Sequence, residues 1–478
     1  MFDPGVLTST VGFRQHVRLG ILGQRTSSAR AFPAPHQPDI RGCCVDCRQL
    51  PGPASLPPAF PSRVGRADGR PGADHFGLSR PVPTSLVFRM AYAASLSLQS
   101  NLAVALNELT SDLMGQLGGP TPDLVLLFVG GAHAEQLPAI QGQLAATFPK
   151  AVLLTCTAES IAGGAREVEE EPALAVWGAT LPGSCLRHFH VVFQNTPDGF
   201  VCDGLPEAPE DQSDLRAILL LADPVSCPIQ ELLERLEQDY PGVPVLGGMA
   251  SYWQNPRDPK LGLNASAVPR GAVGVVLQGG PRVRAVVSQG CRPIGETMIV
   301  TKAEGNQILE LGGRPALTRL EQTYAGLSEQ DRTLLRNGLH LGIAMTEYRA
   351  QFGRGDFLIT NVISAERESG ALAIGNLVRP GQTVQFHVRD SQTAHQDLLE
   401  LLTRLQADRS PGGGALLFSC NGRGSRLFSQ PNHDAALVQE ICGPLPLAGF
   451  FARGELGPVG KRNFIHGFTA SLALFDEV

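Results

Sequence analysis

Hydrophobic and polar side chains follow two different periods along residues 90–478. Apolar residues at helical spacing cover 102–117, and the pattern stops at Gly118-Gly119-Pro120, a sequence that ends helices. Short, continuous apolar runs with the length of buried strands alternate with further helical patterns. They predict a strand, a helix and a strand at 123–129, 135–148 and 151–156. This alternation indicates a mixed α/β fold.

The strand-helix-strand pattern occurs three times. The second copy predicts a strand, a helix and a strand at 216–222, 228–239 and 243–248. An offset of 92 residues places Phe148-Pro149 on Tyr240-Pro241. A third, looser copy places Leu445-Pro-Leu-Ala-Gly449 on Val243-Pro-Val-Leu-Gly247. Shared proline and glycine positions favour duplication over chance similarity between apolar strands.

Two strand patterns follow each of the first two copies. They resemble antiparallel hairpins, at 173–179 with 186–193 and at 271–278 with 282–289. We therefore expect repeated strand-helix-strand-hairpin units that form mixed β-sheets covered by helices. The whole would be a two-domain pseudo-symmetric assembly.

The first 89 residues differ from the rest in composition. They contain 12 prolines, 11 arginines and five aspartates, with no lysine or glutamate, so their net charge is +6, against −12 for residues 90–478. Such a segment buries too little apolar surface to offset the entropy of ordering. Two interpretations stay open: a disordered basic arm, or upstream sequence translated from a mis-called start before Met90. We favour the second, because regular patterning begins at Leu96.

Composition excludes several classes of partner. The net charge of −6 argues against a nucleic-acid or anionic-membrane partner, because either calls for a basic surface. No apolar run approaches the roughly 18 residues of a membrane span. Ten cysteines in 478 residues form no dense disulfide framework, which indicates reduced thiols in the cytoplasm.

Motifs for cofactors and metals are missing. The glycines Gly130-Gly131 do not continue as the dinucleotide-binding pattern, and no phosphate-binding loop motif occurs. The pair Cys44-x-x-Cys47 lacks the second pair of a structural zinc site, and His188 with His190 is typical of a packed strand edge. We expect no cofactor and no metal.

Candidate binding residues gather in the last third of the chain, beside predicted strand ends. Loops beyond the carboxyl ends of strands converge on ligand sites in α/β folds. Arg389, Arg423 and Arg453 suit a carboxylate, and Glu455 suits an ammonium group. The alternative is that the glycines serve turns and the charges pair with one another. The full candidate set is Arg389, Asp390, Cys420, Asn421, Gly422, Arg423, Gly424, Gly449, Arg453, Glu455 and His466.

An enzyme is a competing interpretation of the same region. Cys420, His466 and Glu455 would serve as thiol nucleophile, base and orienting group of an amidohydrolase. Against this, a free cysteine is commonly a buried, inert side chain. A protein-interaction scaffold is the third interpretation.

A series of short motifs resembles a known family. They are Gly290-Cys-Arg-Pro-Ile-Gly295, Val300-Thr-Lys-Ala-Glu-Gly-Asn306, Asp356-Phe-Leu-Ile-Thr-Asn361, Phe386-His-Val-Arg-Asp390, Phe418-Ser-Cys-Asn-Gly-Arg-Gly424, Leu447-Ala-Gly-Phe-Phe451, Gly454-Glu-Leu-Gly-Pro458 and His466-Gly-Phe-Thr469. Together they resemble the C-terminal half of the FIST family (F-box and intracellular signal transduction). The N-terminal half is similar through Leu153 to Ala158, Glu171-Pro-Ala-Leu174 and Leu181-Pro-Gly183.

The resemblance implies an N-terminal FIST domain at 90–290 and a C-terminal one at 291–478. It further implies a stand-alone intracellular sensory module that binds a small ligand, such as an amino acid, and signals to a partner protein. The chain shows no kinase, cyclase or DNA-binding output, and residues 1–89 do not resemble an F-box. The family supplies no ligand contacts, so the candidate residues above rest on the inference from their positions.

Overall fold

The computed structural model describes residues 90–476, with gaps at 120, 197–198, 350, 354 and 408–412. The expectations about residues 1–89, and the Cys44-x-x-Cys47 pair, lie outside the described residues. In the described part of the chain, no helix combines the length and the hydrophobicity that crossing a membrane requires.

Three sheets share one strand order. The first contains β1 (Ala91–Ser97), β6 (Leu174–Thr180), β2 (Leu124–Gly130) and β3 (Val152–Ala158). The second contains, in the same order, β7 (Cys185–Thr196), β13 (Ala272–Gln278), β9 (Leu215–Ala222) and β10 (Val245–Met249), with β8 (Gly199–Asp203) outside β7. The third contains β14 (Val283–Gln289), β26 (Thr469–Phe475), β22 (Gly414–Cys420) and β23 (Leu447–Ala452). The mixed α/β class and the repeated unit are therefore confirmed.

Each sheet is completed by a hairpin from a different repeat. The hairpin β4 (Ile161–Gly163) and β5 (Arg166–Val168) leaves the first repeat and pairs with β23 of the third. The hairpin β11 (Leu261–Leu263) and β12 (Ser266–Val268) leaves the second and pairs with β3 of the first. The hairpin β24 (Glu455–Val459) and β25 (Arg462–His466) leaves the third and pairs with β10 of the second. The exchange is cyclic, so the three repeats have pseudo-threefold symmetry.

The two hairpins predicted between repeats are wrong. Strands β6 and β7 belong to different sheets, as do β13 and β14. Short connections join each pair, but the chain crosses there from the sheet of one repeat to that of the next. The alternation of apolar and polar residues does not show whether the second strand pairs with the first or joins the next sheet. In both cases the strand buries one face against the same core.

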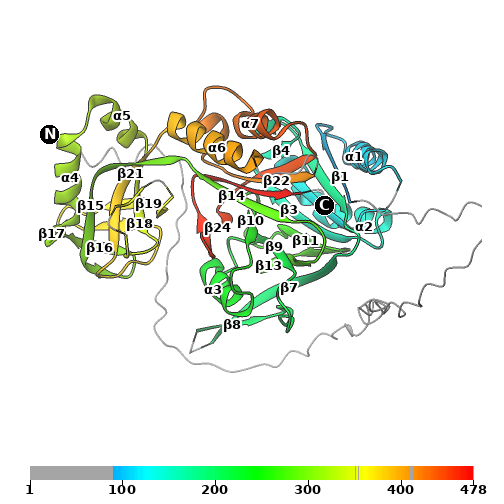
Figure 1. The fold of residues 1–478 in the computed structure, drawn as a ribbon, viewed down its shortest axis with the longest axis horizontal. Helices are drawn as coiled ribbons and strands as arrows, with labels where there is room; N and C mark the ends of the chain where they lie inside the picture. Colours follow the sequence, from blue (N-terminus) through cyan, green and yellow to red (C-terminus); the bar gives the residue numbers. More distant parts are fainter. Residues whose placement is uncertain are drawn as a thin grey trace, which may run out of the picture. The chain divides into compact units, whose positions relative to one another are not determined.

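Helices cover the outer faces of the sheets. They are α1 (Leu102–Leu117), α2 (Leu137–Thr147), α3 (Ile229–Asp239), α6 (Ser391–Gln406) and α7 (His433–Cys442), and α6 and α7 lie side by side (Figure 1). Helix α1 has the predicted bounds, because the Asn101 side chain accepts a hydrogen bond from the Val104 N–H and Gly118 ends the helix at φ 71°. The second helix starts later than expected, since Gly131–Gln136 forms a 3₁₀ turn before it.

A barrel, which was not predicted, interrupts the third repeat between β14 and α6. Its strands run in the closed order β15 (Cys291–Glu304), β21 (Thr383–Arg389), β18 (Leu339–Ala344), β19 (Phe357–Ala365), β20 (Leu372–Ile374) and β16 (Gln307–Leu311), which returns to β15. The short β17 (Arg314–Pro315) follows β16, and α4 (Ala316–Gly326) and α5 (Glu329–Asn337) belong to the same insert (Figure 1). Cys291 is the cross-strand partner of Arg389, so the two ends of the insert meet. The division of the chain at residues 290 and 291 stays a prediction.

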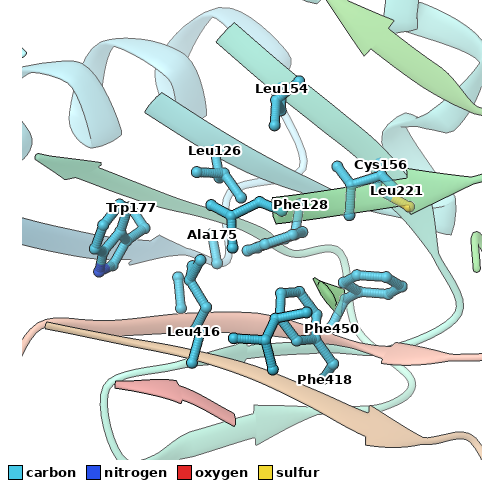
Figure 2. Packing of buried hydrophobic residues seen from close by; sticks show 14 of the residues in the cluster. Leu126, Phe128, Leu154, Cys156, Ala175, Trp177, Leu221, Leu416, Phe418 and Phe450 are labelled. Atoms are coloured by element: carbon cyan, nitrogen blue, oxygen red, sulfur yellow. The ribbon is translucent and has the colours of Figure 1, made fainter. Parts of the chain in front are cut away.

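The inner faces of all three sheets meet in one central core. Phe128 of β2, Phe418 of β22 and Phe450 of β23 face one another in Figure 2, with ring centroids 5.2 to 6.3 Å apart. Leu221 of the second sheet packs into the same cluster. A Cβ at Gly248 would lie 3.3 Å from the Phe450 ring and 2.7 Å from Ala452 Cβ, so the aromatic ring uses the space that this glycine leaves.

We predict that Phe450→Ala lowers the free energy of unfolding by about 3–5 kcal/mol, because it leaves a cavity where the sheets meet. Denaturant unfolding followed by circular dichroism measures the change. A matched control is Leu377→Ala on the barrel, whose side chain is 73% exposed and whose loss should matter by less than about 0.5 kcal/mol. Equal effects of the two substitutions would contradict the central position of Phe450.

Candidate functional site

Most of the candidate residues lie where the third repeat meets the barrel. Arg389 ends β21 of the barrel, and Cys420 ends β22. Glu455 begins β24, and His466, its cross-strand partner, ends β25. These four residues span 77 positions of the sequence, from Arg389 to His466, and the topology places them in one region of the fold.

The ring of Phe468 lies at the centre of this junction. Phe468 has a φ of 63°, which is uncommon for a residue with a side chain. Its ring centroid is 4.1 Å from that of His340, and the Arg389 guanidinium lies over the ring at 5.3 Å. A Cβ at Gly422 would approach the same ring to 2.9 Å, so only glycine fits at this close approach. We call Arg389, Gly422, Phe468 and His340 the junction cluster.

Arg389 is a half-buried guanidinium. It donates one hydrogen bond to the Arg426 carbonyl at 2.9 Å, and within the described ranges no Asp or Glu pairs with it. Burial lowers the pKa of Arg389, and Arg423 and Arg426 add to the positive charge around it. A carboxylate from outside the chain would relieve both effects.

Glu455 is a fully buried carboxyl beside the junction cluster. One oxygen accepts hydrogen bonds from the Thr469 hydroxyl at 2.9 Å and the Thr469 N–H at 3.2 Å. The other, Oε1, lacks an oxygen or nitrogen partner within the described residues, and the Cys420 thiol lies close enough to perturb the carboxyl. Burial raises the pKa of Glu455 to about 8, so the group is mostly protonated at neutral pH.

The proposed catalytic trio is only partly assembled. Cys420 and Glu455 are neighbours, but burial raises the pKa of the Cys420 thiol well above its ordinary value. Burial also lowers the pKa of His466 to about 4, and its Nε2 bonds the Gly457 carbonyl at 3.0 Å. An activated thiol needs the opposite shifts, a depressed thiol pKa beside a cationic imidazole. The electrostatics here favour an inert thiol.

Arg423 has a structural partner that the sequence did not reveal. Its side chain is fully buried and holds Asp434 of α7 with two hydrogen bonds, of 2.7 and 2.8 Å. Although burial opposes ionisation, Arg423 holds the pKa of Asp434 well below its usual range. The fork that was assigned to a ligand carboxylate is thus occupied by Asp434.

Glu167 of β5 extends this buried network to the first repeat. It accepts hydrogen bonds from the Asp434 and Ala435 N–H groups, each at 2.9 Å, at the start of α7. Burial, together with the Asp434 charge, raises the pKa of Glu167 to about 8. The network therefore fastens the exchanged β4–β5 hairpin to the third repeat.

The other candidates have separate structural positions. Asp390 caps α6 and pairs with Arg292 at 3.1 Å, and the Asn421 amide donates to Glu159 at 2.9 Å. Gly424 has a φ of 58° and packs against Glu169. Gly449 was expected beside a strand end, but β23 continues past it to Ala452. A Cβ there would lie 1.8 Å from the Leu417 carbonyl oxygen, so this glycine permits close strand pairing.

Sequence reasoning identified one member, Arg453, of a polar cluster formed at equivalent positions of the repeats, and missed the other two. The repeat offsets align Glu159, Ser251 and Arg453, each of which follows a fully buried alanine. Ser251 accepts a hydrogen bond from the Glu159 N–H at 2.9 Å, and the Glu159 charge acts on Arg453. Arg453 also lies 4.8 Å from the Trp253 ring. The repeat offset could have identified these equivalent positions. It did not, because the three side chains are acidic, neutral and basic and therefore do not resemble one another. For His340 no signal was available, since it lies in the unpredicted barrel.

No group of three or more His, Cys, Asp and Glu side chains within the described ranges has the geometry to hold a metal ion. His188 and His190 lie on β7, and the His190 ring bonds the Arg270 carbonyl at 2.9 Å. These histidines therefore belong to strand packing in this structure.

We predict that Arg423→Met destabilises the fold by about 3–5 kcal/mol, because it leaves Asp434 buried and unpaired. The double variant Arg423→Met/Asp434→Leu should recover much of that loss, since the uncompensated charge is gone. The control Arg404→Met removes a guanidinium that is 75% exposed and 3.6 Å from Glu400, and should change stability by about 0–1 kcal/mol. Urea unfolding measures all three; a double variant no better than the single one would contradict the pairing.

A second prediction concerns pH. The folded state holds the Glu455 proton up to about pH 8, whereas an ordinary glutamate releases it near 4.5. The stability that Glu455 contributes is therefore complete below pH 4.5 and is lost as the pH rises through about 8. Between pH 6.5 and 7.5, Glu455→Gln should make the fall in unfolding free energy shallower by about 1.4 kcal/mol per pH unit. An unchanged slope in urea titrations would show that Glu455 is already ionised in the fold.

Comparisons with known proteins agree with the sequence motifs. A FIST N domain matches residues 123–314, and a FIST C domain matches residues 316–458. An uncharacterized protein of Mycobacterium tuberculosis is 41% identical over 389 residues, which make up 81% of this chain and 100% of that protein. An uncharacterized protein of Mycobacterium bovis is 41% identical over 364 residues, 76% of this chain and 92% of that protein. The crystal structure of a cyanuric acid hydrolase from A. caulinodans matches with a TM-score of 0.24 and 8% identity, over 81% of this chain and 99% of that one, a likeness too weak to carry an argument. The chain belongs to the FIST family, whose domains are sensory domains of signal transduction.

Proposed function

We propose that this protein senses a small carboxylate or zwitterion, such as an amino acid, at the junction cluster. The observation that carries the proposal is the Arg389 guanidinium, which is half-buried and has no carboxylate partner within the described residues. A guanidinium binds a carboxylate through two parallel hydrogen bonds. Such a ligand would replace the hydration that the Arg389 guanidinium loses on burial.

Glu455 supports a zwitterion over a simple acid. The Cys420 thiol is a neighbour of both Arg389 and Glu455, so the guanidinium and the carboxyl flank one position in the fold. An ammonium group at that position would favour the ionised form of Glu455, which burial now opposes. A ligand with both charges would therefore satisfy a guanidinium and a carboxyl together.

Phe468 supports a mechanism for signalling. Its ring lies between barrel residues Arg389 and His340, on a backbone with a positive φ that costs free energy. Both ring nitrogens of His340 are buried without a hydrogen-bond partner among the described residues. A ligand that displaces the Phe468 ring would change the contact between barrel and third repeat. A partner protein that contacts both would detect the change; we propose a protein output, with no role for nucleic acid or membrane.

A thermal-shift screen of amino acids and small carboxylates tests the proposal. A ligand at about 100 times its dissociation constant stabilises the fold by roughly 2.7 kcal/mol, or a few degrees of melting temperature. We predict that Arg389→Lys abolishes most of the shift while the unliganded protein melts normally, because lysine keeps the charge but lacks the planar fork. The control Arg379→Lys, an exposed position on the barrel, should leave the shift unchanged.

Glu455→Gln then tests the role of the ligand's ammonium group separately from that of its carboxylate. It should weaken the shift from amino acids and leave that from simple carboxylates nearly intact. A screen without any shift, or equal shifts in wild type and Arg389→Lys, would refute the proposed site.

A further inference from the structure

Strand β14 leaves one edge of the third sheet unpaired. It pairs with β26 on one side, and the sheet ends there. The Asp476 N–H donates to the Arg282 carbonyl at 3.0 Å, and the Gly290 N–H donates to the Phe468 carbonyl at 3.0 Å. In an antiparallel ladder alternate residues face the partner, so Arg284 and Val286 also bond to β26. The backbone N–H and C=O groups of Val283, Ala285 and Val287 therefore point to the open edge, and no hydrogen bond to them occurs within the described residues.

The equivalent edges of the other two repeats are covered in part. In the first repeat, the Gln116 side chain of α1 bonds both backbone groups of Ala94 on β1, at 3.1 and 2.9 Å. In the second, β8 pairs with residues 192–196 at the end of β7. In the third, the Asp397 carboxylate of α6 accepts the Gln289 N–H at 2.8 Å, which closes only one end of the edge. An unprotected edge strand is rare in native proteins, because it invites pairing with another chain.

A cleft follows this open edge. It has a volume of about 560 Å³ and is lined by Arg282 to Val287 along the strand, by one face of α6 and by the turn between β24 and β25. Arginines 282, 284 and 404 line it, and among the described residues no Asp or Glu does. Arg284 is paired with Asp476 at 2.8 Å. Arg282 and Arg404 are exposed at the rim, where Arg404 lies 3.6 Å from the exposed Glu400.

We propose that the β14 edge is a docking site for an extended, acidic segment of a partner protein, which adds a strand to the third sheet. Main-chain hydrogen bonds to Val283, Ala285 and Val287 would provide affinity, as in other cases of strand addition. Acidic side chains of the segment would pair with Arg282 and Arg404. The β14 edge and the junction cluster have no residue in common. On the proposed function, the docked partner would receive the signal of the sensor.

Charge distinguishes this occupant from the alternatives. A second copy of β14 would bring its own arginines to the same cleft, and like charges across a sheet are destabilising. The N-terminal 89 residues carry a net charge of +6 and contain no glutamate, so they do not complement the rim either. An acidic partner avoids both conflicts.

The test uses the full chain and a set of fluorescent, acetylated eight-residue peptides that alternate valine or threonine with glutamate or aspartate. We expect binding by fluorescence anisotropy, with a lysine-for-glutamate set binding at least tenfold more weakly. In residue-resolved hydrogen exchange, the peptide should slow exchange at Val283, Ala285 and Val287 by tenfold or more. Arg284 and Val286, already bonded to β26, should change little.

Variants separate the edge from general charge attraction. Ala285→Pro removes an N–H that the internal ladder does not use, so the fold should persist while peptide binding is lost. If that variant fails to fold, Arg282→Glu/Arg404→Glu provides the same test and should weaken binding at least tenfold. The control Arg379→Glu makes the same type of change on the barrel and should leave binding intact.

Two results would overturn the proposal. One is the absence of both binding and edge protection across the whole acidic peptide set. The other is protection of Val283, Ala285 and Val287 without peptide that grows with protein concentration, together with a dimer in sedimentation, which would assign the edge to a second copy.

Discussion

The reciprocal exchange of hairpins is the constraint on which the rest of the structure depends. Each of the three sheets takes its last two strands from another repeat, so no repeat can complete its own sheet. The inner faces then share one core, where Phe128, Phe418 and Phe450 are in contact. A cyclic arrangement of this kind couples the stability of all three repeats, because removing one hairpin exposes the edge of a neighbouring sheet as well as its own core face.

The same exchange explains why so many charged groups are buried. Hairpins that cross between repeats carry their polar side chains into interfaces where water is excluded. Glu167 reaches the start of α7 in this way, and Glu455 enters the second sheet beside the end of β22. Buried charges are tolerated when they are paired, as in Arg423 with Asp434, and otherwise they shift their pKa. Hydrogen-bonded pairs therefore stabilise the assembly. Within the described residues, Arg389 has no carboxylate partner and Glu455 Oε1 has no oxygen or nitrogen partner.

Local signals predicted local structure well. Helix α1 was predicted to the residue from its apolar spacing and the stop at Gly118, and the repeats were visible through their shared proline and glycine positions. The barrel was missed because its long first strand is largely solvated; eleven of the fourteen residues of β15 are not buried, so they form no apolar run. The specific partner of Arg423 could not be predicted for a different reason. Its partner Asp434 lies in a separate element, and the intervening turn hides their contact from any linear pattern.

The position of the barrel decides how a signal could leave the protein. Its first and last strands meet at Cys291 and Arg389, so the insert is joined to the third repeat through one narrow region that also contains the junction cluster. On one side of that region the chain leads directly into β14, whose outer edge is open. On the other it leads into α6, where Asp397 binds the last residue of the same edge. Under the proposed function, a change in how Arg389 and Phe468 pack would act on both boundaries of the β14 cleft. Under the proposed function, α6 and β14 would couple the two sites, because β14 ends where the barrel begins and α6 begins where the barrel ends.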